Sequence, residues 1–204
     1  RLHRNDRRGL MKTVKPQELE RLKQLDPAMR LMLVTGPDDS SMAAVAAHLL
    51  RLAGADAERL DLTSAMLSAD PSLLVAEAAS MSLFSPRRVI RLEISGSGDD
   101  CLAAVEALLQ ADKAINPVIA SGASITAKSK LLKLVEASAH AVGAICYQPD
   151  RRALVSIAME TGRAAGLRFG NSEAQLLIDL VSGDQALMRR EIEKIALYLD
   201  ADVG

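Results

Sequence analysis

Leu31-Met32-Leu33-Val34 is a continuous run of apolar residues, and Gly36-Pro37 follows it. A short apolar run of this kind is typical of a strand that is covered on both faces of a sheet. The alanine-rich segment 40–52 comes next and has the character of a helix. Gly54 lies just past this segment, where a glycine that ends a helix is expected. The order of strand, turn and helix is typical of an α/β layer structure.

The alternation of apolar runs with helical segments continues to about residue 149. Further strands are predicted at 59–62, 89–92, 117–120 and 144–147, and helices at 15–25, 71–84, 99–111 and 127–137. After Pro149, helical segments at 151–165, 172–181 and 184–199 follow one another with no strand between them. The pattern therefore predicts an α/β domain with a mostly parallel sheet and, after a boundary near residues 148–151, a small helical domain.

The composition is that of an ordinary globular protein, with 49% hydrophobic and 25% charged residues among 204. A net charge of −1 excludes a basic field over the whole protein, so any nucleic-acid contact must be local. Aromatic residues make up only 2%, which argues against base stacking of the kind used by single-strand binders. Cys101 and Cys146 are too far apart for a metal-ligand motif, and no apolar run is long enough for a membrane span. A cytoplasmic location is expected.

Residues 1–10 differ from the rest of the chain, because four arginines crowd a stretch with little pattern. We interpret this stretch as a disordered leader left by an alternative start or by cloning. A basic arm that contacts nucleic acid is the alternative hypothesis.

The turn after the first strand can be compared with a P-loop, in which glycines, a lysine and a hydroxyl group bind a nucleotide and its magnesium ion. With Gly36 as the first glycine, the second glycine, the lysine and the Ser/Thr positions are occupied by Ser41, Met42 and Ala43. Asp38 and Asp39 add negative charge where phosphates would lie. This degenerate P-loop predicts no cofactor and no ATP hydrolysis. An active ATPase with an unusual loop is the alternative, and stabilisation by ATP would support it.

The remaining candidate residues predict neither catalysis nor metal binding. The histidines His3, His48 and His140 lie in separate predicted elements without a nucleophile nearby in pattern, so we expect no catalytic residue. No metal site is expected either. A basic helical segment contains Lys128, Lys130 and Lys133. These lysines form a solvated face or contact phosphates of DNA or a neighbouring subunit, and the sequence leaves both interpretations open.

The predicted helix at 71–84 ends in an unusual way. One face is expected to pack on the sheet and consists of Leu74, Ala78 and Met81. Leu83 would lie about opposite this face, Phe84 would lie between the two faces, and Ser85-Pro86 would end the helix. Such an exposed Leu-Phe pair is typical of an anchor in a protein interface. In the alternative interpretation the helix ends earlier and both side chains fold into the core.

The chain resembles the delta subunits of bacterial DNA polymerase III clamp loaders over about residues 11–202. Three segments carry the resemblance: the strand and degenerate P-loop from Leu31 to Gly36, the Met81-Ser82-Leu83-Phe84 segment with Arg87-Arg88 after it, and the closing helix from Gly183-Asp184 to Tyr198, which contains Glu191, Glu193-Lys194 and Leu197. The Ser-Leu-Phe segment is fairly specific in this context. The closing helix is shared more loosely with related clamp-loader subunits.

The resemblance implies an AAA+-like α/β domain at 11–149, with a parallel sheet and flanking helices, and a three-helix lid domain at 150–204. It also implies a subunit without catalysis of its own that belongs to a DNA polymerase holoenzyme. Such a subunit binds the sliding clamp (the beta subunit) and helps open its ring for loading onto primed DNA during replication. Leu83 and Phe84 would make the clamp contact, supported by Met81 and Ser82.

The implied partners are the clamp and the other loader subunits (tau/gamma and delta-prime), with DNA reached through the assembled complex and no membrane partner. Members of the family continue into a helical collar domain, which is expected to be absent because the sequence stops at Gly204. The alternative is another inactive AAA+-like adaptor of the delta-prime kind. Relatives of that subunit usually carry zinc-ligand cysteines, a pattern that Cys101 and Cys146 do not provide.

Overall fold

The computed structural model describes residues 13–81, 85 and 87–201. The predicted leader at 1–10 therefore lies outside the described residues. The chain divides into two compact units, 1–147 and 148–204. Among the described helices, none is both long and apolar enough to cross a membrane.

The first unit is built on a six-stranded sheet in the order β1-β6-β2-β5-β4-β3. The strands are β1 (Thr13–Val14), β2 (Leu31–Thr35), β3 (Glu58–Thr63), β4 (Arg88–Glu93), β5 (Val118–Gly122) and β6 (Ala141–Ile145). All neighbouring strands of this sheet pair in parallel. Every residue of β2 is buried, as expected of an apolar strand covered on both faces. The predicted parallel α/β sheet is confirmed.

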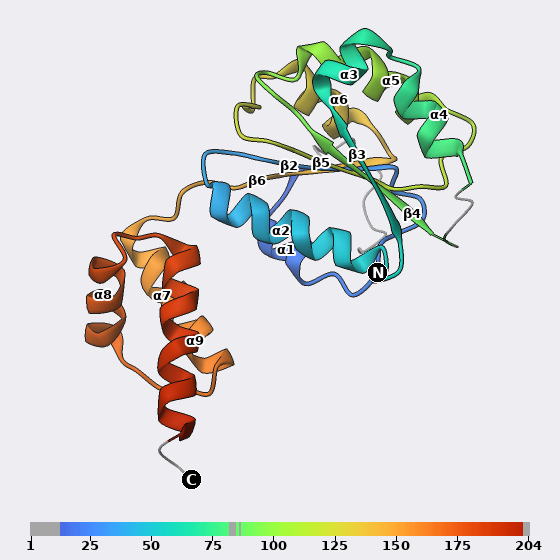
Figure 1. Ribbon diagram of the computed structural model, residues 1–204. Coiled ribbons are helices and arrows are strands. Elements are labelled where there is room, and N and C mark those ends of the chain that lie inside the picture. Colours follow the sequence, from blue (N-terminus) through green and yellow to red (C-terminus); the bar gives the residue numbers. More distant parts are fainter. Residues whose placement is uncertain (1–12, 82–84, 86, 202–204) are drawn as a thin grey trace. The chain divides into compact units, whose positions relative to one another are not determined.

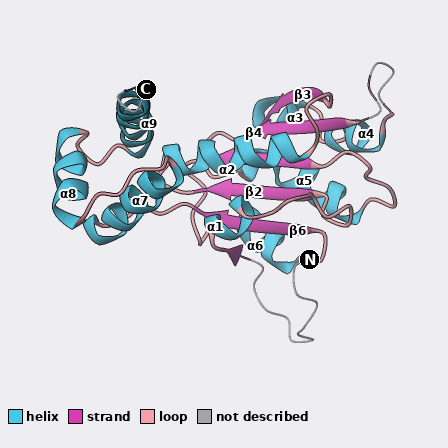
Figure 2. Cartoon of the chain, turned by 90° about the horizontal axis from the view of Figure 1, so that it is seen from below, coloured by secondary structure: helices cyan, strands magenta, loops and turns pink. Residues whose placement is uncertain are grey.

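Helices cover both faces of this sheet (Figure 1). On one face lie α1 (Pro16–Glu20) and α2 (Asp39–Leu52), which Figure 2 shows in front of the strands. The opposite face carries α3 (Ser64–Ala69), α4 (Leu73–Ala79), the 3-10 turn η1 (Asp99–Cys101), α5 (Leu102–Gln110) and α6 (Lys130–Ala137). Side chains of β2 alternate between the two cores: Leu31 and Leu33 belong to the α5/α6 side, and Met32 and Val34 to the α2 side.

Some predicted boundaries were wrong. The helix predicted at 15–25 ends at Glu20, and Leu22 and Leu25 pack against the α2-side core from the following turns. The Leu22 carbonyl, which lies outside any helix, has a partner in α2: it is 3.0 Å from Nε2 of His48. The strand predicted at 144–147 is shifted to Ala141–Ile145. Gly143 lies within this strand, and the absence of a side chain there lets α6 pack closely: an added Cβ would lie 3.0 Å from a Leu132 methyl group.

Further differences concern short elements. The helix predicted at 127–137 begins at Lys130, after Ser129. Neither β1 nor α3 was predicted, because each is too short to show a period. The start of α3 is fixed by Thr63, whose hydroxyl accepts a hydrogen bond from the Met66 amide at 3.3 Å.

The second unit consists, in its described part, of α7 (Arg151–Ala164), α8 (Asn171–Leu180) and α9 (Gln185–Ala201). Its core is formed mainly by Ala158, Ala174, Leu177, Ile178, Val181, Met188 and Ile192. The Asp150 carboxylate caps α7 by accepting a hydrogen bond from the Ala153 amide at 2.8 Å. The predicted helical character of this segment is confirmed.

Candidate functional site

Helix α4 ends earlier than the sequence predicted. It begins at Leu73 rather than Pro71 and stops at Ala79, and the next residue, Ser80, has an extended backbone. Leu74 and Ala78 are fully buried, as expected, but Met81 is 80% exposed, so its predicted packing on the sheet was wrong. The physical reason is that the chain leaves the helix before Met81 can return to the buried face. The predicted position of Leu83 opposite this face assumed a helix that continues past Ala79, and Leu83 itself lies outside the described residues.

The end of α4 is fixed by Asn116, a buried residue just before β5. Its side-chain amide donates to the carbonyls of Glu77 (2.8 Å) and Ser80 (2.7 Å). The backbone amides of Ile115 and Asn116 both donate to the Ala78 carbonyl, at 2.9 and 3.0 Å. Because the last carbonyls of a helix have no partner within it, these bonds stabilise the stop at this position.

Arg88, at the start of β4, connects the end of α4 to the sheet. Its guanidinium binds the Glu58 carboxylate through two hydrogen bonds of 3.1 Å each. It also donates to the Glu77 carboxylate and to the Ser80 hydroxyl, both at 2.7 Å. The Arg88 side chain is only 15% exposed, so these charge-assisted bonds are shielded from water. One side chain thus joins β3, β4 and the C-terminal end of α4.

Both flanks of the candidate segment are therefore held by the α/β unit. Before it, Ser80 is bonded to Asn116 and Arg88. After it, the Ser85 hydroxyl donates to the Asp56 carbonyl at 2.6 Å. The candidate residues Ser82, Leu83 and Phe84 lie outside the described residues. The structure locates this segment only by its neighbours. Met81 before it is strongly exposed, and Ser85 after it is hydrogen-bonded to the domain.

Replacing Arg88 by methionine should lower the free energy of unfolding by about 2 kcal/mol. Charge-assisted hydrogen bonds contribute about 1.5–3 kcal/mol, and partial exposure of the two carboxylates keeps the loss toward the lower end of that range. The variant also removes the cation that Glu58 and Glu77 share. Urea denaturation of both proteins measures the difference.

Arg91→Met is the matched control for this prediction. Arg91 lies on the same strand, is 39% exposed, and only approaches Asp61 and Glu93, at 3.9 and 3.7 Å. We expect the control to change stability by less than about 0.5 kcal/mol. Equal losses in the two variants would contradict the role assigned to Arg88.

The turn between β2 and α2 holds the degenerate P-loop. Gly36 has a φ of +126°, and a Cβ there would lie 2.3 Å from the Cys146 carbonyl oxygen. The Asp38 amide donates to that same carbonyl at 3.2 Å. The Asp38 carboxylate accepts from the Ser41 amide at 3.2 Å and from the Ser41 hydroxyl at 2.6 Å. Two amides at the start of α2, those of Asp38 and Ser41, thus bind groups of the protein.

The other P-loop positions carry no phosphate-binding group. The Met42 side chain, at the lysine position, is buried in the α2-side core, and Ala43 is exposed. Asp38 is buried beside Cys146, and burial, with further contributions from the charges of Asp38 and Glu20, raises the pKa of the Cys146 thiol to about 12. A group that repels a thiolate also repels a phosphate, so this turn is a poor place for a nucleotide.

Millimolar Mg-ATP should leave the melting temperature of the protein within about 1 °C of its value without nucleotide. A ligand present at 100 times its Kd stabilises the native state by about 2.7 kcal/mol, which corresponds to roughly 5–10 °C for a chain of this size. Differential scanning fluorimetry measures the shift. A rise of several degrees that is lost in Asp38→Lys would contradict our interpretation of the turn.

The three candidate lysines lie near one another in the chain and are all exposed. Lys130 and Lys133 are on α6, and Lys128 precedes it. Their exposure fits both interpretations left open by the sequence. Glu93 is exposed at the end of β4, and the described residues contain no cluster of His, Cys, Asp and Glu that could hold a metal ion.

The residues that hold the candidate segment were not found from the sequence. Asn116 and Glu58 are distant from it in the chain, and neither belongs to a motif. The sequence indicates Arg88 only as part of Arg87-Arg88 and does not show its partners. His48 and His140 contact the carbonyls of Leu22 and Ala28, at 3.0 and 3.1 Å, which gives both histidines structural roles.

Comparison with known proteins identifies the fold. No family model matches the sequence, and no curated protein sequence matches it. The structure is similar to the DNA clamp loader delta protein of Bacillus subtilis, with a TM-score of 0.67 and 14% identity. This match covers 90% of the present chain and 56% of the Bacillus chain, so the present chain spans a little over half of that protein's length. The likeness supports the predicted AAA+-like fold: a parallel α/β sheet with flanking helices and a C-terminal helical segment.

Two further structures match with lower scores. A mutant of RuvB from Thermotoga maritima gives a TM-score of 0.44 at 11% identity, covering 87% of this chain and 58% of that one. The AAA domain of FIGL-1 in complex with ADP gives 0.38 at 13% identity, covering 95% and 70%. Neither score is high enough to add to the argument.

Proposed function

We propose that this chain is a clamp-loader subunit of the delta type, which binds a sliding clamp and helps open its ring for loading onto primed DNA. The observation that carries the proposal is the structural likeness to the Bacillus subtilis clamp loader delta protein along 90% of the chain. In this proposal residues 11–149 are the AAA+-like domain and 150–204 the lid. The tau/gamma and delta-prime subunits are the neighbours in the loader, and DNA is contacted through the assembled complex in the cytoplasm.

The proposed clamp contact is the pair Leu83 and Phe84, with Met81 and Ser82 in support. The exposure of Met81 supports it, because an apolar side chain in water at this place can contribute to an interface. The bonds made by Ser80 and Ser85 support it as well, since they fix where the segment leaves and re-enters the domain. A fixed base reduces the conformational entropy that is lost on binding.

The proposed mechanism is mechanical and needs no chemistry in this subunit. An apolar pair that fits a pocket only in the distorted, open ring shifts the clamp toward that state by differential affinity. The turn between β2 and α2 supports a subunit that does not use ATP, because the Asp38 carboxylate accepts hydrogen bonds from the Ser41 amide and hydroxyl. Control by nucleotide would then belong to the partner subunits.

Ring opening tests this proposal directly. A clamp with donor and acceptor dyes on the two sides of one subunit interface should lose energy transfer when the chain is added without nucleotide. Loss of transfer that requires ATP would contradict the proposed division of labour. Unchanged transfer at saturating chain would contradict the proposed function.

A further inference from the structure

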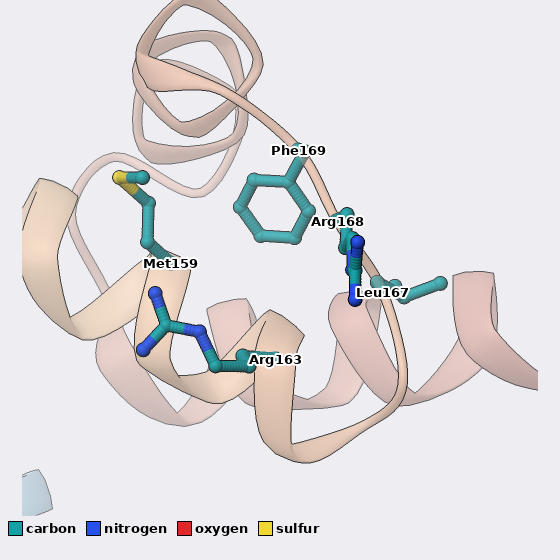
Figure 3. Close-up of a pocket in the computed structure, with 5 residues that line it drawn as sticks. All are labelled: Met159, Arg163, Leu167, Arg168 and Phe169. Atoms are coloured by element: carbon teal, nitrogen blue, oxygen red, sulfur yellow. The ribbon is translucent and has the colours of Figure 1, made fainter.

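A pocket of about 290 Å³ lies in the second unit, between the C-terminal part of α7 and the segment that leads to α8 (Figure 3). It is lined by Met159, Arg163, Leu167, Arg168 and Phe169. Met159 and Arg163 are four residues apart on α7 and therefore lie on one face of the helix. The other lining residues come from the connecting segment. The pocket combines an apolar surface with two guanidinium groups.

The backbone around the pocket is held in place. Gly166 has a φ of +81°, and the Leu167 amide donates back to the Gly162 carbonyl at 2.8 Å, which ends α7 in a tight turn. The Phe169 ring then packs directly on Gly162, where a Cβ would lie 2.2 Å from the ring. On the α8 side, the Gly170 amide donates to the Glu173 carboxylate at 3.0 Å. The pocket is therefore formed before any ligand binds.

The two arginines at the pocket lack an acidic partner within 13–81, 85 and 87–199, where side chains are described. Arg151 on the same helix differs, because it pairs with Asp179 at 2.8 Å. Arg163 lies in the last turn of α7, where the helix carbonyls favour a cation, but Arg168 lies beyond the helix end. Two like charges beside an apolar surface favour an anionic ligand with an apolar group attached.

We propose that this pocket binds an acidic peptide segment of a partner protein. A carboxylate of the peptide binds Arg163 and Arg168, and a neighbouring apolar side chain packs against Phe169 and Met159. Guanidinium groups bind carboxylates through paired hydrogen bonds, and methionine adapts to varied apolar partners. The proposal is independent of the clamp contact at Leu83 and Phe84.

A peptide fits the pocket better than a nucleic acid does. A volume of about 290 Å³ is at the lower bound of small-molecule sites, which makes it suited to one large side chain and a carboxylate. Residues 148–204 contain seven Lys and Arg against nine Asp and Glu, and this net charge of −2 opposes the many charges of a nucleic acid more than the one or two of a short peptide. The pocket also offers a single aromatic ring, whereas single-strand binders stack successive bases on several.

A peptide titration followed by NMR tests the proposal on the full chain. The probe is a glycine-flanked Asp-Phe-Glu peptide, and its control is the same peptide with Asn-Phe-Gln. We expect the acidic peptide to shift the Met159 methyl signal and the neutral peptide to bind at least about tenfold more weakly. Arg168→Gln should weaken binding of the acidic peptide by about tenfold, whereas Arg190→Gln on α9 should leave it unchanged.

Four results would overturn the proposal. The first is the absence of a Met159 shift at millimolar acidic peptide. The second is equal binding of the acidic and neutral peptides. The third is an equal effect of the two arginine substitutions. The fourth is a Met159 shift produced by oligothymidylate but not by the acidic peptide, which would make the pocket a phosphate site.

Discussion

Replacing both Leu83 and Phe84 by alanine is expected to weaken binding of the chain to the sliding clamp by at least about a hundredfold. Burying both side chains contributes roughly 3–6 kcal/mol in gross terms, at about 1.5–3 kcal/mol each. A loss of about 2.7 kcal/mol corresponds to a hundredfold change in Kd. Isothermal titration calorimetry with the purified clamp, carried out without nucleotide, measures the difference.

The matched control is Leu180→Ala with Leu197→Ala. These leucines are 82% and 73% exposed and belong to the second unit, so the control removes two exposed apolar side chains elsewhere in the chain. We expect the control to bind the clamp like the unchanged chain. Equal losses for the two double variants would show that the clamp is bound without a specific Leu-Phe contact.

The same double variant separates the two interpretations of the segment that the sequence left open. If Leu83 and Phe84 are an anchor for a partner, the free energy of unfolding of the free protein should change by less than about 1 kcal/mol. If they belong to the core, large-to-small substitution should lower it by about 2–5 kcal/mol for each residue. Urea denaturation distinguishes these outcomes without any clamp present.

Gly36→Ala should lower the free energy of unfolding by at least about 3 kcal/mol. A left-handed backbone costs a residue with a Cβ about 1–2 kcal/mol, and the Cys146 carbonyl oxygen, 2.3 Å from the new atom, adds a backbone clash. This carbonyl cannot easily move, because the Cys146 amide donates to Thr35 at 2.6 Å and its oxygen accepts from Asp38 at 3.2 Å. Chemical denaturation measures the loss.

Gly96→Ala provides the control for strain without a clash. Gly96 also has a positive φ, +61°, but an added Cβ would meet no atom within 4 Å. We expect a loss of about 1 kcal/mol there. If Gly36→Ala were no more harmful than Gly96→Ala, the close approach of the β2–α2 turn to β6 would not be important for stability.

The sequence predicted those parts of the fold that depend on local pattern. The apolar run at Leu31–Val34, followed by Gly36, predicted β2 and its turn. The alternation of strands and helices predicted the parallel sheet. The strand β6 was misplaced because Gly143 interrupts its pattern. The glycine is suited to the strand because α6 packs on it, which only the folded structure reveals.

The end of α4 shows why the candidate site could be predicted only in part. No proline or glycine stops this helix at Ala79, since residues 80–84 contain neither. The bonds that stabilise the stop come from Asn116, 36 residues after Ser80, and from Arg88 in the next strand. Distant partners of this kind have no signature in a single sequence. The Leu-Phe pair itself was noticed because its scarce aromatic residue lies outside an apolar stripe.

Photo-cross-linking from position 84 is the direct test of the proposed clamp contact. The chain carries p-benzoylphenylalanine in place of Phe84 and is irradiated with purified clamp in the absence of nucleotide, and a second chain carries the same group in place of Leu180 as a control. We expect a covalent product of chain and clamp from position 84 and none from position 180. A clamp complex that forms but gives no product from position 84, or equal products from both positions, would contradict it.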